Sequence, residues 1–180
     1  MTYLSFDDAV QWESWLAEHH EEAGDAWLLI AKKGSGRTSP TSAEAIEVAL
    51  CYGWIDSHRR GHDESYFLQR YSRRRTGSPW SRINVDRAEA LIAEGRMRAP
   101  GEAEIRAARS DGRWESAYAS QATATVPEDL AAALATAPGA TAAFDALDRT
   151  GRYAVILPLL KARTPERRAV LVARAVEALS

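Results

Sequence analysis

Apolar positions in the first part of the chain change from a helical period to a continuous run and back. Between residues 6 and 20 they recur near helical spacing, which predicts a first helix. The run AWLLIAKK at 26–33 is apolar until its two lysines, as in a buried strand. Thr41 and Glu44 then form a capping-box pattern, so a second helix is predicted to begin there.

Two short β-type runs follow the second predicted helix, WIDSHR at 54–59 and SYFLQRY at 65–71, with a turn around Gly61. They predict an antiparallel hairpin. Because an isolated hairpin is only marginally stable in water, we expect it to join the strand at 26–33 in a small antiparallel or mixed sheet.

Helical signals dominate the rest of the chain. Proline suits the first helical turn, so Ser78 and Pro79 predict the start of a third helix, and a fourth is expected over 101–110. After Tyr118 the chain is alanine-rich, and prolines at positions 127, 138, 158 and 165 are expected to separate short helices. The apolar face expected of the last helix comprises Ala169, Val172, Ala173, Val176 and Leu179.

These elements predict an α+β fold, a small antiparallel or mixed sheet packed with helices and followed by an all-helical part. All six tryptophans lie before residue 115, which indicates a tryptophan-rich core in the first part. We therefore expect an α+β domain over residues 1–118. An alanine-rich helical region over 119–180 is expected to pack on it.

Composition narrows the location and the partners. Lys and Arg number 23 against 25 Asp and Glu, so nothing biases the whole chain toward nucleic acid or an anionic membrane. No stretch approaches about 18 uninterrupted apolar residues, so no membrane span is expected. The single cysteine, Cys51, fits a reducing compartment. The beginning MTYLSFDDAVQWESWL lacks the basic and apolar regions of a signal peptide, so we expect a cytoplasmic protein.

Several short segments occur together in one order: ALCYGWIDS, YFLQRYSRRRTGSPWSRIN, EGRM followed by APG, DGRWESAY and VPEDL. In this combination the chain resembles the YdeI/OmpD-associated family, the bacteriocin-protection proteins, from about Trp12 to the C-terminus. The resemblance implies a small bacterial protein associated with stress or antimicrobial defence. It implies no catalytic residues and no established reaction, so an enzyme is less expected than a binding protein.

The strongest local chemical signal is RYSRRRTGSPWSRIN at 70–84, where arginines precede the predicted third helix. A helix N-terminus offers free N–H groups and partial positive charge, and guanidinium groups match phosphate or carboxylate. In an extended segment Arg73 and Arg75 share one face and Arg74 opposes them. We therefore predict that an anionic ligand or partner binds between hairpin and third helix, at Arg73, Arg75, Ser78, Trp80, Ser81 and Asn84, with Asp56 and His58 beside it. A serine-capped helix beside solvated arginines explains the same residues without a ligand.

Two alternative functions use neighbouring residues. Asp56 and His58 lie two apart on a predicted strand and share a face, so an unrecognised hydrolase could use them as an acid–imidazole pair. The arginines of the hairpin, interleaved with Tyr66, Phe67 and Tyr71, could instead bind nucleic acid. The pI of about 6.1 makes nucleic acid the less expected partner.

No cofactor or metal is expected. His58 and His62 are four apart, but Gly61 between them indicates a turn, and no second cysteine supports a thiolate site. Cys51 lies beside the apolar stripe of the second predicted helix, which favours a core position over a nucleophile. The oligomeric state is left open by the sequence.

Overall fold

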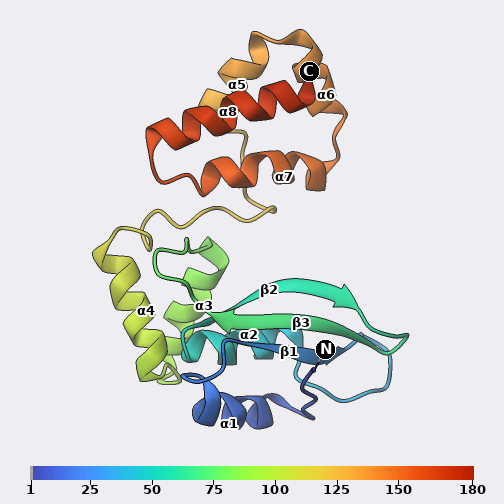
Figure 1. Cartoon of the computed structure of the whole chain (residues 1–180), viewed down its shortest axis with the longest axis vertical. Coiled ribbons are helices and arrows are strands. Elements are labelled where there is room, and N and C mark those ends of the chain that lie inside the picture. Colours follow the sequence, from blue (N-terminus) through green and yellow to red (C-terminus); the bar gives the residue numbers. More distant parts are fainter. Residues whose placement is uncertain (1) are drawn as a thin grey trace. The chain divides into compact units, whose positions relative to one another are not determined.

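The computed structural model describes residues 2–180 and divides them into two compact units. The first holds residues up to Trp80 together with 84–116, and the second holds 81–83 together with 117–180. Within the described residues the chain forms three strands and eight helices (Figure 1), which confirms the α+β class. None of these helices is both long and apolar enough to cross a bilayer.

The first unit is built on an antiparallel sheet of β1 (Asp25–Ala31), β2 (Trp54–Gly61) and β3 (Tyr66–Arg73) in the order β1-β3-β2. The predicted hairpin therefore joins the strand near residue 26, as expected. The turn follows Gly61, because the Asp63 carboxylate accepts the backbone N–H groups of Ser65 and Tyr66 at 2.7 and 2.8 Å.

Helices α1 (Ala9–His19) and α2 (Ser42–Cys51) supply buried side chains to the core of this unit. Helix α1 begins later than predicted because Asp8 is its N-cap and accepts the N–H of Gln11 at 2.9 Å. The capping box of Thr41 and Glu44 is confirmed, since each side chain accepts the backbone N–H of the other. The fully buried aromatic side chains of the unit are Trp12, Trp54, Tyr71 and Trp80.

Helix α3 (Arg82–Ala93) begins four residues after the predicted Ser78. In a helix starting at Ser78, the carbonyl of Ser78 would accept the N–H of Arg82. That N–H instead donates to the carbonyl of Tyr118 at 2.9 Å, and the Ser78 carbonyl accepts the guanidinium of Arg113 at 2.9 Å. The predicted start is wrong because the Arg82 N–H and the Ser78 carbonyl both form hydrogen bonds with residues distant in sequence. Helix α4 (Ala99–Ser110) lies close to its predicted range.

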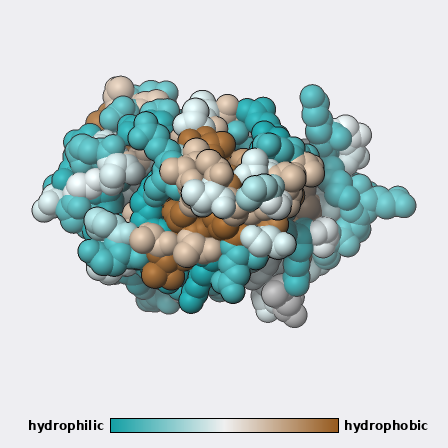
Figure 2. All heavy atoms as spheres, turned by 90° about the horizontal axis from the view of Figure 1, so that it is seen from above, coloured by the Kyte–Doolittle hydropathy of each residue, from teal (hydrophilic) through white to brown (hydrophobic). Residues whose placement is uncertain are grey.

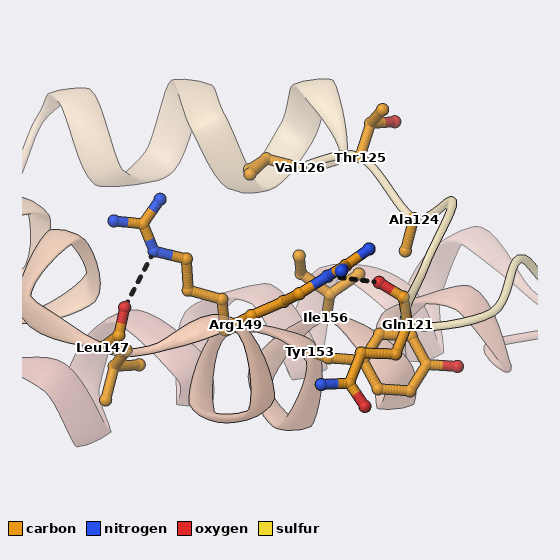
Figure 3. A pocket seen from close by; sticks show the side chains of 9 residues that line it. Gln121, Ala124, Thr125, Val126, Leu147, Arg149, Tyr153 and Ile156 are labelled. Carbon is orange, nitrogen blue, oxygen red and sulfur yellow. Dashed lines mark hydrogen bonds between the residues drawn. The ribbon is translucent and has the colours of Figure 1, made fainter.

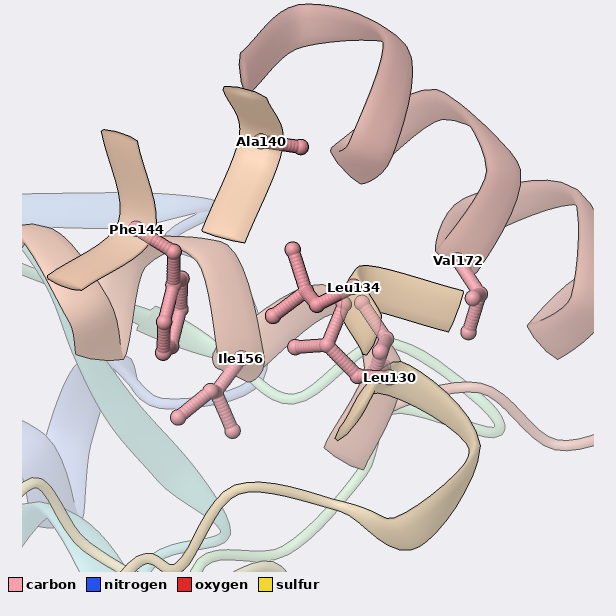
Figure 4. Packing of buried hydrophobic residues seen from close by; sticks show 7 residues of the cluster. Leu130, Leu134, Ala140, Phe144, Ile156 and Val172 are labelled. Atoms are coloured by element: carbon pink, nitrogen blue, oxygen red, sulfur yellow. The ribbon is translucent and has the colours of Figure 1, made fainter. Parts of the chain in front are cut away.

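The second unit is helical, with α5 (Glu128–Ala135), α6 (Pro138–Ala146), α7 (Arg149–Leu160) and α8 (Pro165–Leu179). Three prolines mark helix starts as predicted, but Pro158 lies inside α7. Figure 4 shows the apolar side chains that meet between these helices. Of the five residues predicted for the apolar face of α8, Ala169 and Ala173 are exposed. The buried core of the unit comprises Leu130, Leu134, Ala140, Phe144, Ile156, Leu159 and Val172.

The surface is mostly hydrophilic on the face drawn in Figure 2, with apolar side chains gathered in one central area. Large apolar side chains that are exposed occur in both units, among them Val10 at 70% and Val170 at 44%. Single exposed apolar side chains such as Val10 and Val170 are ordinary for a folded protein and by themselves mark no binding surface.

Candidate functional site

Arg74 organises the segment that follows β3. Its side chain is buried, and its guanidinium lies 3.6 Å from the centroid of the Trp80 ring. Nη1 donates to the Ser78 hydroxyl at 3.5 Å and to the Pro79 carbonyl at 3.4 Å. A desolvated cation over an indole ring is among the stronger cation–π contacts, so this arginine holds the segment in its non-helical form.

Arg113 fixes the same segment from the other side. It is 5% exposed, its Nε donates to both carboxylate oxygens of Asp111 at 2.7 and 2.8 Å, and its Nη1 donates to the Ser78 carbonyl. The ring of Trp114 meets that of Trp80 edge-on at 4.9 Å. No sequence pattern singled out Arg113 as a functional residue, although the DGRW motif that contains it is one of the family segments.

A cavity of about 510 Å³ lies at the end of β3. The chain turns into it at Gly53, whose φ of +71° is natural only for glycine, and a Cβ there would lie 3.1 Å from the Pro100 carbonyl oxygen. Its walls come from the ends of α1, α2 and β3 and from the start of α4: His20, Glu21, Tyr52, Gly53, Arg73, Arg74, Thr76, Ala99, Pro100, Ala103 and Glu104.

Arg73 supplies a guanidinium to this cavity without a carboxylate partner. Its Nη1 donates to the backbone carbonyl of Glu21 at 2.9 Å, and no carboxylate within residues 2–180 forms an ion pair with it. A neutral carbonyl satisfies one donor and leaves the guanidinium without a direct ion-pair partner. The cavity therefore holds a positioned cation with donors to spare.

Acidic and aromatic groups share the cavity with Arg73. The carboxylate of Glu104 has no cationic partner in the described part of the chain, and the Glu21 carboxylate lies 3.8 Å from Nε2 of His20. His20 is held by a 2.9 Å contact between Nδ1 and the Leu16 carbonyl. Burial raises the pKa of Tyr52, which disfavours its phenolate form further, so this side chain brings a neutral hydroxyl to the cavity.

The structure gathers only part of the predicted anion-site set. Arg73 lines the cavity, whereas Arg75 is exposed and is not among the lining residues. Ser78 and Trp80 contact Arg74 instead. Ser81 forms an isolated β-bridge with Tyr118. The side-chain oxygen of buried Asn84 accepts a hydrogen bond from the Arg87 guanidinium at 3.2 Å. Ligand binding by the full set stays a prediction.

Asp56 and His58 are both exposed on β2. The pairing of β2 with β3 is irregular between Asp56 and Arg59, so simple alternation of faces does not hold there. Within residues 2–180 no hydrogen bond joins the two side chains. The geometry that a general-base pair needs is therefore not formed in this structure.

Cys51 occupies a core position, as predicted. It is 3% exposed, and burial raises the pKa of its thiol to about 11. A protonated, buried thiol is a poor nucleophile, so Cys51 acts here as a small apolar side chain.

Comparisons with known proteins assign the two parts of the chain to different families. Residues 4–104, which include Arg73 and the cavity, match the family described as Domain of unknown function (DUF8412). Residues 123–180 match the family Bacteriocin-protection, YdeI or OmpD-Associated, which confirms the resemblance. Several of the motifs that carried the resemblance lie within residues 4–104, outside that second match. No curated protein and no solved structure matches the chain significantly. The chain belongs to the DUF8412 family over residues 4–104 and continues, over residues 123–180, into a match to the bacteriocin-protection family.

Proposed function

We propose that the chain is a cytoplasmic binding protein of the bacteriocin-protection type, whose first unit takes the anionic group of a small ligand or protein partner at Arg73. The match of residues 123–180 supports a bacteriocin-protection-like role at the level of the family. The position of Arg73 supports the anionic ligand, since its guanidinium lines an open cavity and contacts only a neutral carbonyl.

A guanidinium with no direct carboxylate contact is the physical basis for binding at Arg73. A guanidinium held by one carbonyl keeps several N–H groups for a second acceptor, and a charged acceptor gains more than a neutral one. The cavity volume of about 510 Å³ lies in the range of small-molecule sites. A single carboxylate or phosphate group is therefore the expected contact of Arg73.

The acidic wall narrows the choice of ligand. Glu21 and Glu104 line the same cavity, so a polyanion would meet repulsion there. A ligand that carries one anionic group beside a hydrogen-bond donor or a cation satisfies both sides of the cavity. This favours a compact, mixed-charge ligand over a nucleic-acid strand.

The two alternative functions receive less support. Two of the three aromatic residues proposed to stack bases are not free platforms: Arg59 lies 4.3 Å from the centroid of the Phe67 ring, and Tyr71 is buried. For a hydrolase, the required contact between Asp56 and His58 is not formed. Binding at Arg73 is the function that the geometry favours.

The test is a calorimetric titration of the full chain with phosphate, sulfate, acetate and nucleotides. We expect Arg73→Gln to weaken binding of the preferred anion at least about tenfold, as the loss of one charge-assisted contact predicts. Arg75→Gln removes a neighbouring exposed arginine that does not line the cavity, and it serves as the matched control. Equal effects of the two substitutions, or none, would show that Arg73 is not the anion contact.

A further inference from the structure

The second unit contains a separate cavity of about 450 Å³. It lies between the segment 121–126 and the first half of α7, and Figure 3 shows both bordering it. Its polar groups include the guanidinium groups of Arg149 and Arg152. This cavity shares no residue with the one at Arg73, so a ligand bound here is independent of the proposed function.

Arg149 is held in place by neutral groups alone. Its Nε donates to the Gln121 carbonyl at 3.2 Å and its Nη2 donates to the Ala122 carbonyl at 2.8 Å (Figure 3 marks the first of these). No carboxylate in the described chain pairs with it. Two backbone contacts fix the guanidinium, while its remaining N–H groups and its full charge stay available to a ligand.

Arg152 adds a second, partly compensated charge. Its Nε donates to the Leu147 carbonyl at 3.1 Å and its Nη2 donates to the Asp145 carbonyl at 2.6 Å. The Asp145 carboxylate lies 3.7 Å away and is 66% exposed, so solvent screens its effect. The nearby Asp148 carboxylate accepts the Gly151 N–H at 2.7 Å and caps α7. The residues that line the cavity therefore carry two guanidinium groups and no carboxylate.

The remaining walls are largely apolar. Val126, Leu147 and Ile156 line the cavity, and the Val126 side chain is 38% exposed. The Tyr153 hydroxyl donates to the Ala119 carbonyl at 3.0 Å, so this phenol is already engaged and its ring serves as wall. A ligand that contacts both the arginines and the apolar wall of the cavity carries one anionic group and an apolar body.

We propose that this cavity binds a small organic carboxylate with an apolar body, held by Arg149 and Arg152 at its head. The guanidinium fork matches the two oxygens of a carboxylate, and burial of the ligand body against the apolar wall adds the hydrophobic contribution. A compact inorganic anion obtains only the first of these contributions, and an apolar alcohol obtains only the second. The preference for amphipathic carboxylates follows from their combination.

The probes are octanoate, octanol, octylammonium and inorganic phosphate, each titrated into the full chain by calorimetry. Octanoate is expected to bind at least about tenfold more tightly than the other three. Arg149→Gln is expected to weaken octanoate binding by a similar factor while leaving octanol unchanged. Arg167→Gln, an exposed arginine of α8 outside the cavity, is the matched control and leaves octanoate binding unchanged.

Because Arg149 also holds the segment at Gln121, a second variant leaves that contact intact. Val126→Asp places a carboxylate at the exposed wall and is expected to abolish octanoate binding with no loss of thermal stability beyond that of Arg149→Gln. The same titrations in an Arg73→Gln background, which lacks the anion contact proposed for the first cavity, are expected to retain an octanoate site that Arg149→Gln then removes. This separates the second cavity from the first. Octanoate that binds no more tightly than octanol, or equally to the parent and to both cavity variants, overturns the proposal.

Discussion

The guanidinium of Arg74 lies 3.6 Å from the centroid of the Trp80 ring, and both side chains are buried. This contact fixes the chain between β3 and α3 and turns Arg74 inward. Arg73, one residue earlier, is left at the edge of the cavity. Consecutive arginines thus serve different purposes, one in the core and one at a candidate site.

Arg74→Ala is expected to destabilise the fold by about 2–3 kcal/mol, since it removes a desolvated cation–π contact and two hydrogen bonds. Urea denaturation measures this free energy of unfolding. Arg75→Ala changes an exposed side chain and is expected to fall within about 0.5 kcal/mol of the parent. A change at Arg74 as small as the one at Arg75 would mean that the stacking contact contributes nothing.

Gly101 lies in α4 where a Cβ would lie 2.5 Å from the carbonyl oxygens of Leu50 and Cys51. Backbone atoms cannot yield easily, so Gly101→Ala is expected to destabilise the protein by about 1–3 kcal/mol or more. Gly139 in α6 has nothing within 4 Å of its Cβ position, and Gly139→Ala is expected to stabilise by about 0.5–1 kcal/mol. Thermal unfolding of the two variants should shift the midpoint in opposite directions.

The ion pair of Asp129 and Arg168 joins α5 to α8 with contacts of 2.5 and 2.9 Å. Arg168 holds the pKa of Asp129 below its usual value. The pair therefore stabilises the fold above the pKa of Asp129 in the unfolded chain, about 3.9, and loses its contribution as pH falls through the lower folded value.

Since the pair is partly exposed, Asp129→Asn is expected to cost about 0.5–1 kcal/mol at pH 7 and less at pH 2. Denaturant titrations at the two pH values measure the difference. A cost that is the same at both would indicate that the charge of Asp129 plays no part.

Cys51 should react slowly with thiol reagents in the folded protein. With its pKa near 11, the thiolate fraction at pH 8 is about two orders of magnitude below that of an unfolded cysteine with a pKa of about 8.5. Labelling with a chromogenic disulfide should therefore be at least about a hundredfold faster in urea than in buffer. Similar rates in both would place Cys51 at an accessible, activated position.

Local signals predicted the elements whose contacts are themselves local. The capping box of Thr41 and Glu44 and the hairpin depend on neighbours a few residues apart or on strand periodicity, and both were predicted. The start of α3 was misplaced because Arg113, 35 residues from Ser78 in sequence, takes the carbonyl that a helix would need. No local pattern at Ser78 carries that information.

The candidate site could be predicted only in part for the same reason. The sequence shows three consecutive arginines, whose side chains are expected to alternate between two faces, and Arg73 does line a cavity. The cavity itself depends on the ends of α1 and α2 meeting the start of α4, with Glu21 and Glu104 brought beside Arg73. These neighbours are set by tertiary packing, so the acidic wall could not be foreseen.

The most direct test of anion binding at Arg73 is a nuclear magnetic resonance titration of the full chain with sulfate or the best anion from calorimetry. The titration follows three signals from the border of the cavity: the side-chain Nε–H of Arg73 and the backbone amides of Gly53 and Thr76. We predict that these signals shift together along one saturating curve and that Arg73→Gln abolishes the shifts at Gly53 and Thr76. Signals that stay unchanged to saturating anion, or amide shifts that persist in Arg73→Gln, would contradict binding at Arg73.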